Sequence, residues 1–391
     1  MADQVDLRGG AHAAGDRDAA RAHQLHSLMD SFALYLHIPF CKKKCAYCDF
    51  TSFAGREDLW NAYLAALESE LLAARATYGR RPISTIFVGG GTPSLVPADW
   101  IMHLLAMARA LFQVDPGAEI TLEANPGTVT RAKLRDYRDA GVNRLSLGMQ
   151  TAEAELLQML GRIHTQREVE ETVALARDAG FQNLNLDLMY ALPTQTMAQW
   201  VDTLKQALNL KPTHLSMYSL ILEPGTPLAA RVDAGELPAP DEELTLKMQH
   251  AAARIVGGRG FQRYEISNYA LAGCACRHNL AYWTRANYLG VGLSAHSLMD
   301  SARFSNTDCL PDYLAGRREC AREVIDEAGA REEAILLGTR LARGIDEALV
   351  KDRAQEIAQM KALGLIGQAA GRISLTEKGM DVQNAVVLKL I

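Results

Sequence analysis

Short apolar runs rich in branched and aromatic residues alternate with longer amphipathic stretches along this chain, and this alternation limits the folds open to it. Such runs predict buried strands, and six are expected at residues 34–38, 85–88, 119–122, 144–147, 184–188 and 214–220. Between them, apolar residues recur every three or four positions, as on one face of a helix. This spacing predicts helices at residues 59–77, 98–112, 131–140, 167–179 and 197–208.

The repeated strand–helix order predicts an α/β fold with a parallel sheet, because parallel neighbours need a long crossover connection. Short spacing between the units favours a partial (β/α)6 TIM-like barrel, although periodicity alone does not exclude a doubly wound sheet. The alternation ends near residue 300, and later patterns predict a small, mostly helical C-terminal domain with a wing-like hairpin at residues 372–376. We therefore expect a disordered N-terminal tail (1–30), a barrel with its extension (31–300) and a winged-helix-like domain (301–391).

The charge balance argues against polyanionic partners. The chain has 41 Lys and Arg against 46 Asp and Glu, a net charge of -5, so it lacks long-range attraction for nucleic acid or an anionic membrane. Residues 331–391 carry nine basic and eight acidic side chains, which favours a structural or docking role over DNA binding. No stretch has the roughly 18 consecutive apolar residues of a membrane span, and charged residues interrupt any signal-peptide core in residues 1–30. We expect a cytoplasmic protein that is not integral to a membrane, although peripheral contact stays open.

Three cysteines, Cys41, Cys45 and Cys48, lie within eight residues directly after the first expected strand. Three soft ligands on one tight loop suit an iron–sulfur cluster, and one metal position is then left open. Structural zinc normally takes four ligands, and the nearest candidates, His37 and Asp49, lie poorly placed in or beside the same loop. We expect a cluster here, with zinc or inert buried thiols as alternatives.

Two neighbouring features bear on this metal site. Residues 42–44 are all lysine, and their charge should lower the thiolate pKa values and offset an anionic cluster, although a solvated basic loop explains them equally well. Gly89-Gly90-Gly91-Thr92-Pro93 follows the second expected strand, where the glycines let backbone amides approach a ligand closely. Both motifs should lie at the same carboxyl-terminal mouth of the sheet.

Cys41-x3-Cys45-x2-Cys48 together with the glycine motif resembles the radical S-adenosylmethionine (SAM) proteins. The resemblance implies a radical SAM barrel and a [4Fe-4S] cluster whose open iron is chelated by the amino and carboxylate groups of SAM. The glycines would cradle the methionyl amino group. In such proteins the cluster supplies an electron that cleaves SAM to a 5′-deoxyadenosyl radical, so the cofactors carry the chemistry and the protein binds and shields them.

Further blocks resemble the family of oxygen-independent coproporphyrinogen III oxidase (dehydrogenase)-like proteins, from about Tyr35 to the C-terminus. They include Glu123-Ala-Asn-Pro126, Leu147-Gly-Met-Gln150, Gly161-Arg-x-His164 and Leu186-Asp-Leu-Met-Tyr-Ala-Leu-Pro193. By this resemblance eight residues would line the SAM pocket: Tyr35, Gly90, Gly91, Thr92, Glu123, Gln150, Arg162 and Asp187. Glu123, Gln150 and Asp187 also fall at the ends of expected strands, where barrels bind ligands, although any one of them could simply cap its strand.

Two features separate the chain from the decarboxylating members of that family. Those members continue the cysteine motif with a fourth cysteine, at the position where this chain has Phe50. The chain also has His278-Asn-Leu-Ala-Tyr282-Trp283, which matches the His-Asn-x-x-Tyr-Trp signature of the haem chaperone branch. His278 could ligate haem iron or belong to a loop hydrogen-bond network, and Tyr282 and Trp283 could stack on the macrocycle.

These features leave three functions to compare. The first is a haem chaperone that binds haem and delivers it to haemoproteins such as respiratory enzymes. The second is an oxidase that decarboxylates the propionates of coproporphyrinogen III in porphyrin biosynthesis by a radical SAM mechanism. The third is a structural zinc protein. Phe50 and the signature at His278 favour the first, and an exposed cysteine loop is also compatible with a homodimer.

Overall fold

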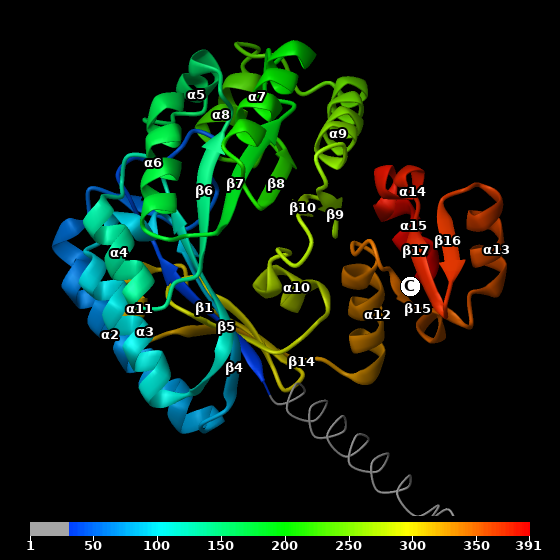
Figure 1. Cartoon of the computed structure of the whole chain (residues 1–391). Coiled ribbons are helices and arrows are strands. Elements are labelled where there is room, and N and C mark those ends of the chain that lie inside the picture. The colour runs from blue at the N-terminus through cyan, green and yellow to red at the C-terminus, as the bar shows by residue number, and fades with distance from the viewer. Residues whose placement is uncertain (1–30) are drawn as a thin grey trace, which may run out of the picture.

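The computed structural model describes residues 31–391, so the expected tail at residues 1–30 lies outside the described part. A twelve-stranded sheet forms its centre, in the order β14-β13-β12-β11-β1-β4-β5-β6-β7-β8-β10-β9. Helices cover the outer face of the curved sheet, and the C-terminal unit lies beside α9 (Figure 1). Because β14 and β9 remain edges of the described sheet, the barrel is partial, as expected.

Six parallel strands form the barrel in chain order, and each coincides with a region predicted from the sequence, although the last one ends at Ser219, one residue earlier than expected. They are β1 (Phe32–Ile38), β4 (Pro82–Gly90), β5 (Gln113–Ala124), β6 (Arg144–Gln150), β7 (Asn183–Tyr190) and β8 (His214–Ser219). A seventh parallel strand, β11 (Tyr288–Val291), pairs with β1 on its other side. The carboxyl ends of these strands therefore meet at one mouth.

The helices predicted between these strands are also present. They are α2 (Trp60–Tyr78), α3 (Ala98–Leu111), α4 (Arg131–Asp139), α6 (Gln166–Asp178) and α7 (Met197–Asn209). In α3 the buried residues Ile101, Leu104, Leu105 and Ala108 follow the three- and four-residue spacing of one helix face. Threonine side chains begin α6 and α7 with capping boxes.

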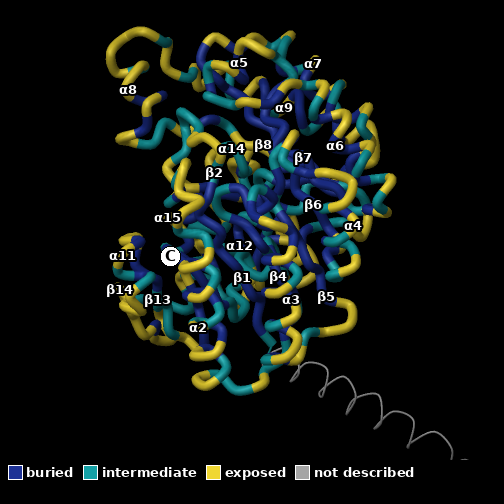
Figure 2. The backbone as a smooth tube through the Cα atoms, turned by 90° about the vertical axis from the view of Figure 1, so that its left-hand side faces the viewer, coloured by how far each residue is buried: buried dark blue, intermediate teal, exposed yellow. Residues whose placement is uncertain are grey.

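Apolar residues of the strands face the helices, while polar residues face the barrel interior. Leu145 and Leu147 of β6 belong to the main hydrophobic core, whereas Arg144 and Ser146 line an internal cavity. This alternation follows from the two-residue side-chain period of a strand. Buried residues run along the strands and exposed residues lie on the outer helices and loops (Figure 2). The barrel interior is thus built for polar ligands.

Antiparallel strands extend both edges of the barrel. On one edge lie β12 (His296–Met299), β13 (Ala302–Asn306) and β14 (Glu319–Val324), and on the other lie β10 (Asn268–Ala270) and β9 (Gln262–Arg263). The main sheet therefore continues through Val324, past the domain boundary expected at residue 301. Every residue of β14 is exposed, so its sequence lacks the apolar alternation that marks a strand.

Shorter elements complete the part of the chain between residues 31 and 324. They are β2 (Phe40–Cys41), β3 (Phe53–Ala54), η1 (Glu57–Leu59), η2 (Pro93–Leu95), α5 (Ala154–Met159), α8 (Pro227–Asp233), α9 (Glu242–Gly257), α10 (Arg277–Trp283) and α11 (Leu310–Leu314). Several of them lie in the loops at the barrel mouth.

The C-terminal unit has its own hydrophobic core, which includes Ile335, Val350, Met360 and Ile373. It contains α12 (Glu327–Gly338), β15 (Ile345–Asp346), η3 (Glu347–Val350), α13 (Ala354–Ala362), β16 (Ile366–Ala369), β17 (Arg372–Leu375), α14 (Glu377–Asp381) and α15 (Gln383–Leu390). A hairpin is present, but it begins earlier than expected: β17 covers most of the predicted residues 372–376, and its partner β16 precedes them. Within residues 31–391, no helix has the length and apolar character needed to cross a bilayer.

Candidate functional site

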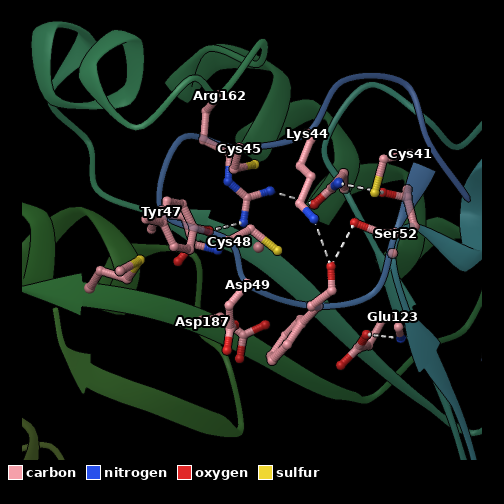
Figure 3. Close-up of a pocket in the computed structure, with 18 of the residues that line it drawn as sticks. Cys41, Lys44, Cys45, Tyr47, Cys48, Asp49, Ser52, Glu123, Arg162 and Asp187 are labelled. Atoms are coloured by element: carbon pink, nitrogen blue, oxygen red, sulfur yellow. Dashed lines mark hydrogen bonds between the residues drawn. The ribbon is translucent and has the colours of Figure 1, made fainter. Parts of the chain in front are cut away.

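The three clustered cysteines lie on a loop that is fixed at several points. Cys41 ends β2, which pairs with β3 and so closes the base of the loop. At its centre, the Ala46 amide donates to the Leu160 carbonyl at 2.9 Å, and the Ala46 carbonyl accepts from the Leu228 amide at 2.8 Å. All three cysteines are partly buried and line one cavity (Figure 3). The loop is therefore held in place by its neighbours.

The glycine motif packs directly against this loop. The Gly91 amide donates to the Ile38 carbonyl at 2.9 Å, and the Thr92 amide donates to the Phe40 carbonyl at 2.8 Å. A Cβ atom at Gly91 would lie 2.8 Å from the Phe40 carbonyl oxygen and 2.9 Å from the Cys41 sulfur. Only glycine allows so close an approach. The structure thus brings the two motifs together at the barrel mouth.

Both motifs line a cavity of about 410 Å³ at this mouth. Seven of the eight residues expected in the SAM pocket line it as well: Gly90, Gly91, Thr92, Glu123, Gln150, Arg162 and Asp187. The eighth, Tyr35, instead lines a smaller cavity of about 150 Å³ deeper in the barrel. Its hydroxyl is 3.0 Å from His37 Nδ1. Tyr35 lies in the middle of β1, below the strand ends that form the mouth.

Two partly buried carboxyl groups, of Glu123 and Asp187, lie in the wall shared by the two cavities. Glu123 accepts a hydrogen bond from the Gly90 amide at 3.1 Å, and burial, with repulsion from Asp187, raises its pKa to about 8. Burial also raises the pKa of Asp187, against hydrogen bonds from Asn185 and Ser146. The raised pKa of Glu123 keeps this carboxyl group protonated at neutral pH, so it can both donate to and accept from hydroxyl or amino groups of a ligand.

Arg162 links the cysteine loop to the carboxyl ends of the strands. Its Nη2 donates to the Tyr47 hydroxyl and its Nη1 donates to Asn125 Oδ1, both at 2.8 Å. Asn125 also donates to the Thr92 hydroxyl at 2.9 Å. Arg162 Nε has no hydrogen-bond partner among the described residues. The sequence reasoning missed Tyr47 and Asn125 as site residues, although both belong to motifs that it used.

Burial outweighs the effect expected of the lysines on the thiol groups. The pKa values of Cys41 and Cys48 are raised above the usual thiol value by burial, even though Lys44 acts in the opposite direction on Cys48. Lys44 instead donates to the Phe50 carbonyl at 3.0 Å. Without a metal to hold the charge, these two thiols therefore stay protonated at neutral pH.

The donor set fits an iron–sulfur cluster. Between residues 31 and 391, no three His, Cys, Asp or Glu side chains lie close enough together to hold one metal ion, yet three thiols line a single cavity. In a [4Fe-4S] cluster each thiolate binds a different iron, so its ligands lie farther apart than ligands around one zinc ion. Three thiolates leave the fourth iron for another ligand.

The signature at His278 lies away from this cavity. Its Nδ1 is 2.8 Å from the Thr85 hydroxyl and its Nε2 is 2.9 Å from the Tyr282 hydroxyl. Burial lowers the pKa of His278 to about 3. Both ring nitrogens of His278 are therefore hydrogen-bonded. This is the hydrogen-bond network that the sequence offered as the alternative to haem ligation. Trp283 packs under the Arg340 guanidinium at 4.3 Å and lines neither cavity.

Comparison with known proteins assigns the family. Residues 35–207 match the model of the radical SAM superfamily. The chain is 34% identical to the heme chaperone HemW of Bacillus subtilis over 90% of this chain and 97% of that protein. It is 39% identical to HemW of Haemophilus influenzae over 73% of this chain and 76% of that protein.

A solved structure confirms the fold. Coproporphyrinogen III oxidase (HemN) from Escherichia coli, described as a radical SAM enzyme, superposes with a TM-score of 0.80 at 23% identity. The match covers 94% of this chain and 93% of that structure, so it includes the C-terminal unit. The cysteine loop, the cavity at the barrel mouth and the near full-length identity together show that the chain belongs to the HemW family of radical SAM proteins.

Proposed function

We propose that this protein is a haem chaperone, which binds haem and delivers it to haemoproteins such as respiratory enzymes. The observation that carries the proposal is the identity to proteins named heme chaperone HemW over nearly the whole length of both chains. The geometry supports it, because the cysteine loop and the polar pocket share one cavity at the barrel mouth. We place this activity in the cytoplasm.

In this proposal Cys41, Cys45 and Cys48 hold a [4Fe-4S] cluster, and SAM occupies the polar part of the same cavity. When bound, the cluster supplies an electron that can cleave the sulfonium of SAM. The residues of the chain bind and orient the two cofactors. The backbone at Gly90 and Gly91 approaches the ligand closely, and the carboxyl groups of Glu123 and Asp187 accept from its hydroxyl or amino groups.

The alternative of coproporphyrinogen III decarboxylation has less support. The likeness to HemN at 23% identity shows the fold alone. Phe50 lines the cavity at the position where the resemblance gives the decarboxylating proteins a fourth cysteine. Its ring supplies apolar surface rather than a thiol.

One reconstitution experiment tests the function. We expect protein reconstituted anaerobically with iron and sulfide to show [4Fe-4S] absorption, to bind haem and to transfer it to an apo-haemoprotein. Cys45→Ala should abolish the cluster, because two thiolates cannot hold it, while the matched Cys309→Ala, at an exposed cysteine, should keep it. Formation of protoporphyrinogen from coproporphyrinogen III, with reductant and SAM present, would reject the chaperone function in favour of the oxidase.

Two further parts of the proposal concern assembly. We propose that the winged C-terminal unit has a structural or docking role, because its charges are balanced rather than basic. We also propose that the cluster stabilises a homodimer through the exposed part of its loop. Sedimentation of the reconstituted protein and of Cys45→Ala tests this, since a dimer that persists in the variant would not depend on the cluster.

A further inference from the structure

Three large apolar side chains that project into solvent lie around the mouth of one cavity. Among the exposed hydrophobic residues between positions 31 and 391 are Phe50 at 63%, Ile221 at 68% and Tyr218 at 44%. All three line the cavity that also holds the cysteines. Isolated exposed apolar residues are ordinary on a protein surface, but three on one rim, two of them aromatic, mark a binding surface.

The backbone holds Phe50 in this position. Its carbonyl accepts from Lys44 Nζ at 3.0 Å and from the Ser52 hydroxyl at 3.3 Å; Figure 3 labels the two donors. These bonds use the main chain only, so they fix the residue without covering its ring. With the backbone held, only the two side-chain torsions of Phe50 remain to be ordered when a ligand binds, so the entropic cost of contact is low.

The other two rim residues come from the end of β8 and the loop that follows it. After β8 the chain continues into residues 220–222, where Leu220 and Leu222 pack into a satellite apolar cluster beside α5 and α8. Ile221, between these two leucines, is exposed instead. Tyr218, near the end of β8, lines both this cavity and the smaller one deeper in the barrel, so it lies at the boundary between them.

Charged groups complete the rim. Lys43 and Lys44, from the cysteine loop, line the cavity and can pair with carboxylates. Asp49 and Glu223 also line it, so the rim is not a general anion site. A ligand that fits must therefore combine a broad apolar face with carboxylates confined to one edge. Haem has this distribution, with two propionates on one side of a flat macrocycle.

We propose that haem binds at this rim, with its macrocycle on Phe50, Tyr218 and Ile221 and its propionates toward Lys43 and Lys44. The inference rests on the proposed function, since it locates the haem that the function requires. It places haem over the opening of the SAM cavity and away from His278. Haem bound there covers the mouth and slows the escape of SAM.

The region around His278 is poorly suited to the same ligand. The cavity beside it measures about 150 Å³, whereas sites for drug-sized ligands measure about 300–1,000 Å³. Coordination of iron by His278 would break its hydrogen bond to either Thr85 or Tyr282. Trp283 is already covered by Arg340. The signature thus shapes the barrel interior.

Haem titration of the reconstituted full-length protein tests the site. The Phe50→Ala/Ile221→Ser double variant should bind haem at least about tenfold more weakly, because two apolar contacts are lost. Metal-free protoporphyrin IX should lose affinity in parallel, since the rim contacts the macrocycle and not the iron. Phe50→Leu, which keeps an apolar side chain, should stay close to the wild type. [4Fe-4S] absorption and SAM affinity, measured first, should be unchanged in each variant.

Control variants separate the possible results. Leu363→Ala and Leu388→Ser alter residues that are 59% and 73% exposed on the C-terminal unit, and they should bind haem like the wild type. Wild-type affinity in the double variant would overturn the rim site and leave the chaperone function intact. If the double variant binds haem like the wild type but transfers it poorly to an apo-haemoprotein, the rim contacts the recipient protein and is not the haem site. A wild type that binds no haem would overturn the function itself.

Discussion

Glu123 carries an energetic cost that depends on pH. Its pKa in the folded protein is about 8, raised by burial from an ordinary value of 4.5. Between these values the unfolded chain has released this proton while the folded protein keeps it. Stability therefore falls as pH rises through this window. We expect Glu123→Gln, which can still accept from the Gly90 amide, to be more stable than the wild type at pH 8, by on the order of 1–3 kcal/mol.

Urea unfolding of the cofactor-free protein at pH 5 and pH 8 measures this effect. The advantage of Glu123→Gln should be much smaller at pH 5, because this pH lies only about half a unit above the ordinary pKa of 4.5 and the unfolded state gains little there from releasing the proton. Glu170→Gln, at an exposed residue of α6, is the matched control and should leave the free energy of unfolding unchanged at both pH values. An advantage of equal size at pH 5 and pH 8 would show that Glu123 does not titrate in this window.

His278 gives the opposite dependence on pH. Its pKa in the folded protein is about 3, lowered by burial from 6.5. The neutral His278 side chain therefore contributes its full share of the free energy of unfolding above pH 6.5, and this share is lost as pH falls below that value. His278→Ala leaves the Thr85 and Tyr282 hydroxyls without their partner and should cost about 1–3 kcal/mol at pH 7.5. The cost should shrink at pH 5. His296→Ala, at an exposed histidine, should change little, and equal stability of His278→Ala and wild type at pH 7.5 would rule out the network.

At the scale of elements, the cysteine loop depends on the turn between α5 and α6. Gly161 has a φ of +73°, and a Cβ atom there would lie 3.1 Å from the Ala46 amide nitrogen. Gly161→Ala should therefore strain its own backbone and also push the loop away from its Leu160 anchor. We expect a loss of about 1–3 kcal/mol and a lower iron content after reconstitution.

A second glycine separates these two effects. Gly235 has a φ of +74°, and nothing lies within 4 Å of the position that a Cβ atom would take. Gly235→Ala should thus cost stability through its backbone alone and leave the iron content unchanged. Equal iron content in both variants would show that contact with the α5–α6 turn does not shape the cluster site.

The elements that the sequence predicted are those with strong apolar periodicity. The six barrel strands and their helices pack into one core, so burial imposes a pattern that the sequence displays. The strands β12, β13 and β14 escaped prediction, because short antiparallel edge strands need few buried residues and β14 has none. For this reason the domain boundary expected at residue 301 separated β13 and β14 from the sheet to which they belong.

The residues of the candidate site also fall into two groups, those that local motifs predicted and those that they did not. The cysteines and glycines lie in local motifs, so spacing along the chain brought them into one prediction. Tyr35 and His278 depend on depth within the barrel, which a linear sequence does not display. The exposure of Ile221 was equally hidden, because it follows from the packing of the leucines on either side. The positions of these residues depend on contacts between distant parts of the chain, which the spacing of motifs along the sequence does not reveal.

At the scale of the whole molecule, Glu333 of α12 joins the C-terminal unit to the main sheet. It accepts from Arg285 at 2.6 Å and from Arg303, in β13, at 2.7 Å. These residues are partly buried, so the ion pairs are less exposed to water than typical surface pairs. A second contact pairs Arg340 with the buried Glu265 at 3.2 Å. These ion pairs thus hold the C-terminal unit in a defined position against the barrel's extension.

Glu333→Ala should loosen this seat, because it leaves two arginines without their carboxylate. We expect hydrogen exchange to rise in α12 while the barrel strands stay protected, with a local cost of about 1–3 kcal/mol. The two arginines hold the pKa of Glu333 below its ordinary value of 4.5, so the wild-type contribution is present above that pH and is lost as pH falls through it. Glu332→Ala, at the exposed neighbouring residue, should leave exchange unchanged. Faster exchange confined to the barrel, with α12 still protected, would show that the unit is seated by its apolar contacts instead.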